Sequence, residues 1–164
     1  MIDTKTKLQK TLKVLSLSIM GITCIYFAMN WMRLPDTIPV HYNLAGEVDR
    51  MGSKFEMIML PIVMIVLTSS LFIIEKHPNA WNTGVTITEG NKERVYKTLG
   101  NLICVVQFLL VIIFSYLILT TFGLVPMGNL ITPVFLTILA VIIVYYIVKI
   151  LKVSKINKEE TPIS

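Results

Sequence analysis

The sequence predicts an all-α integral membrane protein, with four transmembrane helices and a structured extracytoplasmic loop between the first and second. Hydrophobic residues make up 54% of the 164 residues and charged residues only 15%, whereas a soluble domain carries about 25% charge. A helix needs about 20 apolar residues to cross the hydrocarbon layer. Long runs without charge place the spans at about residues 13–32, 57–75, 98–121 and 131–150.

The first span is the charge-free run between Lys13 and Arg33. It is longer than the apolar core of a signal peptide, and no small-residue cleavage site follows it. We therefore expect it to remain in the membrane as a helix.

A capping box marks the start of the second span. The side chains of Ser53 and Glu56 are spaced so that each can accept a hydrogen bond from the other residue's backbone N–H. This pattern predicts that the second helix begins at Ser53. Pro61 then falls inside the helix, where we expect a kink. At the far end of the span, Glu75 and Lys76 are interpreted as an ordinary pair at the membrane surface.

The third and fourth spans come from one run without charge, residues 98–148. The run is too long for one crossing, and two glycines and a proline interrupt it at residues 122–129. It therefore predicts two helices joined by a tight turn. Before it, residues 88–97 are polar on one side and predict a short interfacial helix leading into the third span.

Basic residues predict the orientation. Twelve Lys and Arg residues lie on the side shared by both termini and by the loop between the second and third spans, against three on the other side. The positive-inside rule then places both termini in the cytoplasm. The net charge of +5 is explained by this orientation and by anionic lipid, without nucleic acid. We thus expect a cytoplasmic basic tail at residues 1–12, a membrane domain at 13–151 and a cytoplasmic tail at 152–164.

The segment 34–54, LPDTIPVHYNLAGEVDRMGSK, is the most polar part between the first two spans. Pro35 and Pro39 favour extended backbone around them. Gly46 and Gly52 permit turns. We therefore expect an extended, turn-containing outer loop that carries polar side chains at the membrane surface.

The same segment resembles the DUF1648 family, whose members form the N-terminal half of SdpI-type membrane proteins. The pattern Pro-x-x-(Ile/Val)-Pro-x-His-aromatic-Asn, then Gly, Asp and Gly-x-Lys, is matched by Pro35, Ile38, Pro39, His41, Tyr42, Asn43, Gly46, Asp49, Gly52 and Lys54. A second stretch, which begins with HPNAWNTGVTIT at His77, adds Asn82, Asn91, Arg94 and Tyr96. The resemblance covers roughly residues 30–100; the second half of the SdpI pattern is absent from the sequence.

This resemblance implies a multi-pass protein of the bacterial cytoplasmic membrane. It also implies immunity to a secreted antimicrobial peptide, sometimes coupled to a cytoplasmic regulator. The first functional hypothesis is therefore immunity or stress protection against a membrane-active peptide, through the outer loop. The expected partners are the lipid bilayer, a secreted antimicrobial peptide, a cytoplasmic regulator and a second copy of the chain.

The residues of the loop leave other interpretations open. His41 and Asn43 can hydrogen-bond loop carbonyls and fix the loop to the helix ends. His41, Glu47 and Asp49 form a weak metal set, because structural zinc usually recruits several Cys or His ligands. His41 with Asp36 or Asp49 can form an acid–base pair. No cofactor motif is present.

The alternatives to immunity are a membrane enzyme or metal site that uses His41, and a regulatory subunit of a transporter or sensor. The sequence offers no nucleophile motif beside the histidine, so we assign no catalytic residue. An ion carrier is disfavoured because the interior of no predicted span holds a clear charged residue.

Overall fold

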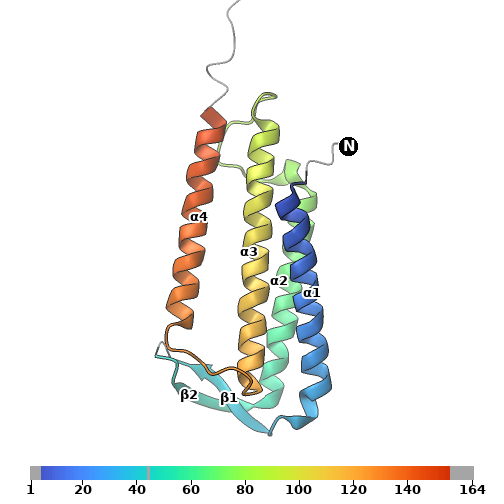
Figure 1. Ribbon diagram of the computed structural model, residues 1–164, viewed down its shortest axis with the longest axis vertical. Helices are drawn as coiled ribbons and strands as arrows, with labels where there is room; N and C mark the ends of the chain where they lie inside the picture. The colour runs from blue at the N-terminus through green and yellow to red at the C-terminus, as the bar shows by residue number, and fades with distance from the viewer. Residues whose placement is uncertain (1–4, 44, 156–164) are drawn as a thin grey trace, which may run out of the picture.

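The computed structural model describes residues 5–43 and 45–155. Within this part of the chain, four helices are long and apolar enough to cross a membrane. They are α1 (Lys7–Asn30), α2 (Met59–Lys76), α3 (Lys92–Thr121) and α4 (Ile131–Lys155), and they form an elongated bundle (Figure 1). The predicted fold class is confirmed.

Helix α3 is the packing centre of the bundle, because α1, α2 and α4 each pack against it (Figure 1). Polar side chains add hydrogen bonds between α3 and two of these helices. The Thr23 hydroxyl of α1 donates to the Ser115 hydroxyl of α3 over 2.9 Å. The amide of Gln107, expected to bond between helices, donates to the Thr68 carbonyl of α2 over 3.4 Å. Such polar contacts hold helices together where lipid removes the hydrophobic drive to associate.

A β-hairpin covers one end of the bundle. Strands β1 (Thr37–Tyr42) and β2 (Val48–Ser53) pair antiparallel. Short 3-10 helices, η1 (Trp31–Arg33) and η2 (Lys54–Ile58), connect them to α1 and α2. Ile38 is 2% exposed and joins the hydrophobic core of the bundle. The sequence predicted extended backbone and turns here; the pairing into a sheet was not foreseen.

The entrance to α2 differs from its prediction. The capping box of Ser53 and Glu56 is present, but it opens the 3-10 helix η2 rather than α2 itself. Helix α2 begins only at Met59. Pro61 therefore lies in the first turn of α2, where its missing N–H leaves no helical bond unmade, and not in the interior of the helix.

The entrance to α3 also corrects a prediction. The polar residues before the third span do not form a separate interfacial helix, because α3 runs without a break from Lys92 to Thr121. A short 3-10 helix, η3 (Pro78–Ala80), occupies the preceding loop.

The two predicted tails are partly helical. Helix α1 begins at Lys7, inside the expected N-terminal tail, and α4 continues through Lys155. Residues 1–4 and 156–164 of those tails lie outside the described residues.

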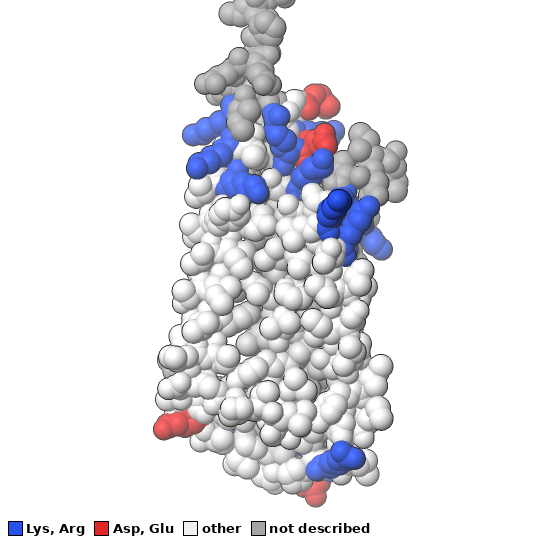
Figure 2. All heavy atoms as spheres, viewed as in Figure 1, with Lys and Arg blue, Asp and Glu red and all other residues white. Residues whose placement is uncertain are grey.

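On the face that Figure 2 shows, charged side chains gather at the two ends of the bundle and the middle carries none. The end that carries the start of α1 and the end of α4 holds eleven of the fourteen described Lys and Arg residues. The hairpin end holds Arg33, Arg50 and Lys54. The uncharged middle is what an apolar membrane core requires of the protein surface.

Glu75 does not form the surface pair with Lys76 that the sequence suggested. It is buried, and its carboxylate pairs with the Lys13 ammonium of α1. The same ammonium lies 5.7 Å from the centre of the Phe72 ring. The ion pair thus joins α1 to α2, a helix pair that otherwise makes few contacts.

We expect Glu75→Ala to destabilise the bundle strongly, because it leaves the largely buried Lys13 charge without its carboxylate partner. Loss of one member of a buried pair costs about 3–5 kcal/mol. Unfolding of the purified protein in detergent measures this. Lys76→Ala, at the exposed neighbouring position, is the matched control and should change stability little. Equal stability of the two variants would contradict a buried pair.

Candidate functional site

The hairpin covers a groove at its end of the bundle. One hollow, of about 350 Å³, lies between the hairpin, α2 and α3. A second, of about 200 Å³, adjoins it on the side of α4. Val40, Tyr42, Leu117 and Met127 line both hollows. Binding sites for small molecules usually measure about 300–1,000 Å³, so the groove has the size of such a site.

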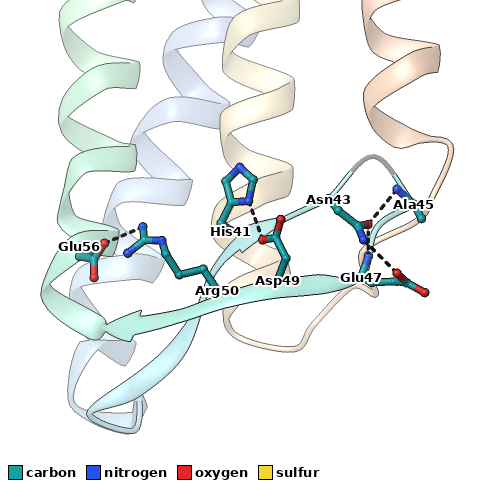
Figure 3. A network of polar contacts seen from close by, with 7 residues as sticks. All are labelled: His41, Asn43, Ala45, Glu47, Asp49, Arg50 and Glu56. Atoms are coloured by element: carbon teal, nitrogen blue, oxygen red, sulfur yellow. Dashed lines mark hydrogen bonds and ion pairs between the residues drawn. The ribbon is translucent and has the colours of Figure 1, made fainter.

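Asn43 organises the tip of the hairpin (Figure 3). Its side-chain oxygen accepts from the backbone N–H of Ala45, at 2.9 Å, and of Glu47, at 3.0 Å. Its amide nitrogen donates to the Glu47 carboxylate over 2.9 Å. Asn is suited to this because its short side chain mimics a backbone turn. Asn43 therefore bonds amide groups of the turn, whereas the sequence suggested carbonyls.

Gly46 lets the hairpin tip approach the turn between α3 and α4. Its φ is +78°, a conformation that glycine adopts without a steric penalty. A Cβ atom at this position would lie 3.0 Å from backbone atoms of Asn129. The Tyr116 hydroxyl fixes the same turn, because it donates to the Pro126 carbonyl over 2.6 Å and accepts from the Gly128 N–H over 3.2 Å. The hairpin is thus seated against a braced turn.

His41 and Asp49 face each other across the two strands, with His41 Nδ1 2.6 Å from Asp49 Oδ1 (Figure 3). Of the two, His41 lines the second hollow. Both side chains are substantially exposed. Glu47, the third member of the proposed metal set, bonds Asn43 instead. Among the described residues, no group of three or more His, Cys, Asp or Glu side chains is placed to hold a metal ion.

Arg50 and Glu56 form a second charged pair at the groove. The guanidinium lies 2.9 Å from the Glu56 carboxylate, and both residues line the first hollow. The other Glu56 oxygen accepts from the Ser53 N–H over 3.2 Å. Gly52 gives this carboxylate room, because a Cβ there would collide with it and with Val40. The capping box therefore fixes a charge at the rim of the groove.

Lys54 fixes the segment that enters the hairpin. Its ammonium lies 2.8 Å from the Asp36 carboxylate and 3.5 Å from the Leu34 carbonyl. The hydrogen bond and charge of Lys54 lower the pKa of Asp36 below its usual range. Pro35 is exposed beside this contact, whereas Pro39 lies within β1 and lines the first hollow. Lys54 therefore fixes the entrance of the hairpin, and Pro39 contributes to the wall of the groove.

Tyr42 is half-buried in the wall of both hollows. Burial raises the pKa of its hydroxyl, and the nearby Tyr116 hydroxyl raises it further. Tyr42 is therefore neutral at physiological pH, and its ring and hydroxyl give the groove one apolar surface and one hydrogen-bonding group.

The second loop lies at the opposite end of the bundle from the groove (Figure 1). Asn91 is 2% exposed and donates to the carbonyls of Thr86, at 3.0 Å, and Ser154, at 3.4 Å.

The other predicted residues of the second loop make contacts within the loop and with the start of α3. The Tyr96 ring packs against Trp81. Asn82 accepts from the Gly84 N–H, and Arg94 donates to the Gly90 carbonyl. The predicted site residues therefore form two separate groups, and this one fixes the loop to the end of α4.

The fold and the groove define a small multi-pass membrane protein with a structured hairpin at one membrane boundary. Residues 19–65 match the model of a family described as a domain of unknown function, DUF1648. The matched segment runs from α1 through the hairpin into α2, so the predicted resemblance is confirmed there. The second loop lies beyond the match.

A relative from an archaeon matches part of the chain. Over 67 residues the chain is 34% identical to an uncharacterized protein of Archaeoglobus fulgidus. The match covers 41% of this chain and 37% of the archaeal protein, so it spans little more than a third of that relative's length. No solved structure matches the chain.

Several groove residues escaped the sequence analysis. Arg50 was counted only as a loop charge, and Glu56 only as a helix cap. Leu117 and Met127 come from a distant part of the chain and carry no motif. Only the capping box gave a usable signal, since it predicted where the Glu56 carboxylate would be held.

Gly46→Ala should destabilise the protein more than Gly84→Ala, which is the matched control. Both glycines have positive φ, but a Cβ at Gly84 meets no atom within 4 Å. Each alanine pays about 1–2 kcal/mol for the left-handed backbone, and Gly46→Ala must in addition displace the turn at Asn129. Thermal unfolding in detergent compares them. Equal losses would show that the hairpin tip does not depend on this close approach.

Lys54→Gln should return the pKa of Asp36 toward its ordinary value, because Lys54 causes the depression. A carboxyl with a depressed folded pKa contributes stability above its unfolded pKa and loses it as the pH falls through the folded pKa. In the wild type the Lys54 contact therefore weakens only in acid. Carbon-13 NMR titration of the Asp36 carboxyl measures the shift. An unchanged pKa in Lys54→Gln would contradict the pairing.

Proposed function

We propose that this protein protects a bacterial cytoplasmic membrane against a membrane-active peptide, and that the hairpin and its groove are the working surface. The observation that carries the proposal is a braced, amphipathic groove at the membrane boundary. Arg50 and Glu56 supply its polar rim, and Met57 and Leu60 lie among its apolar lining residues. A site of this composition suits a ligand that is itself amphipathic.

The orientation proposed for the protein puts the hairpin outside. The excess of Lys and Arg at the opposite end supports this assignment through the positive-inside rule. An external peptide would then meet the hairpin first, before it inserts in the bilayer. The match to DUF1648, which occurs in SdpI-type immunity proteins, supports the proposed protective role.

Rigidity supports a binding role for the hairpin. Asn43 closes its tip, Gly46 seats it on the turn at Asn129, and Lys54 fixes its entrance. A surface that is ordered before the ligand arrives loses less conformational entropy on binding. The surface is therefore suited to recognition.

Expression of the full chain in a sensitive bacterium, challenged with a panel of secreted membrane-active peptides, tests the proposal. Survival and membrane potential are the readouts. We expect protection against at least one peptide, and loss of it in Tyr42→Ala and His41→Ala, which remove groove-lining side chains. Arg33→Ala, an exposed basic residue at the same end outside the groove lining, should keep protection.

Failure of the wild type to protect against any peptide, with membrane expression confirmed, would contradict the proposed function. Asp49→Asn separates docking from acid–base chemistry at His41. The substitution keeps the size of the side chain but removes its charge, so a docking surface retains protection, whereas an acid–base pair loses its activity.

A further inference from the structure

The groove opens beside the surface that α2 presents to lipid. Met59 lines the first hollow and is 58% exposed. Ile62, one turn further along α2, is also exposed. The centres of the Trp31 and Phe55 rings lie 5.7 Å apart at the same end, and tryptophan favours the level of lipid head groups. A lipid in the surrounding layer can therefore reach the groove sideways.

The rim of the groove presents both signs of charge. Arg50 and Glu56 stand 2.9 Å apart at the first hollow. A guanidinium carries five N–H donors, so the contact with Glu56 leaves Arg50 with donors for a second anion. Each Glu56 carboxylate oxygen likewise has more than one acceptor position. The pair can therefore bind a ligand that itself carries an anion and a cation close together.

Apolar side chains continue inward from this pair. Met57, Met59 and Leu60 line the hollow from η2 and α2, and Leu117 lines it from α3. Methionine is unbranched and adapts to irregular apolar partners. The hollow thus combines a zwitterionic rim with an adaptable apolar floor, beside the hydrocarbon layer.

We propose that the groove binds a phospholipid whose head group carries a phosphate and a primary ammonium, as in phosphatidylethanolamine. The phosphate contacts Arg50, the ammonium contacts Glu56, and the start of an acyl chain lies over Met59 and Leu60. The proposal rests on the proposed function for its site, and it names the membrane component that the site would hold.

Head groups that differ by single features test this proposal. The full chain, purified in detergent, is titrated with dioleoyl phosphatidylethanolamine, phosphatidylcholine and phosphatidylglycerol, and bound lipid is counted by native mass spectrometry. The choline head group keeps the phosphate and the positive charge but has no N–H to donate. Phosphatidylglycerol keeps the phosphate but has no cation. We expect phosphatidylethanolamine to bind about tenfold more tightly than either, as one charge-assisted hydrogen bond allows.

Variants assign the preference to the rim. Glu56→Gln keeps an acceptor for the Ser53 N–H but removes the charge, and it should abolish the preference for phosphatidylethanolamine over phosphatidylcholine. Arg50→Gln should weaken binding of all three lipids, because all three carry the phosphate. Arg33→Gln is the matched control for loss of one arginine at this end and should bind as the wild type does. Thermal unfolding shows that each variant is folded.

Equal affinity for the three lipids would overturn the proposal, even with the wild type alone. Tighter binding of phosphatidylglycerol would overturn it in favour of a simple anion site. Retention of the preference in Glu56→Gln would also overturn it. No peptide is present in this experiment: a lipid preference without protection contradicts only the proposed function, and protection without a lipid preference contradicts only the present inference.

Discussion

The absence of a hydrophobic drive between helices in lipid is the constraint on which this structure depends. Apolar side chains gain little by leaving lipid for one another, so close packing and buried polar contacts must hold the bundle. Helix α3 packs against all three of the other long helices. Its Ser115 bonds Thr23 of α1 and its Gln107 bonds Thr68 of α2. The Lys13–Glu75 pair then joins α1 and α2 directly, where few other contacts do so.

The groove results from how the hairpin is fixed to this bundle. Leu34 and Ile38 are buried at the hairpin's entrance and first strand. At the other extreme, Gly46 meets the turn that Tyr116 braces between α3 and α4. Supported at both ends, the hairpin spans the helix ends without filling the space above Leu117, which is the space that becomes the groove.

The sequence predicted features that depend on local pattern and missed those that depend on pairing between distant residues. The spans followed from runs without charge, because a charge in the bilayer is costly wherever the helix packs. The hairpin was missed since its register, with Ile38 opposite Gly52, depends on the fit of both strands to the bundle. Glu75 was assigned to its sequence neighbour because the burial that selects Lys13 instead arises only when α1 and α2 meet. The groove's distant wall, at Leu117 and Met127, has the same origin.

The position of the paired charges is explained by the membrane boundary. An isolated charge close to the hydrocarbon layer costs solvation energy, whereas a pair of opposite charges lowers that cost. Strand β2 holds Arg50 against Glu56 of η2, and it holds Asp49 against His41 of β1. Strong polar groups are therefore retained beside lipid at little net charge. A paired sheet maintains this arrangement better than an irregular loop, because strand pairing fixes His41 relative to Asp49 and the end of β2 leads directly into η2, which carries Glu56.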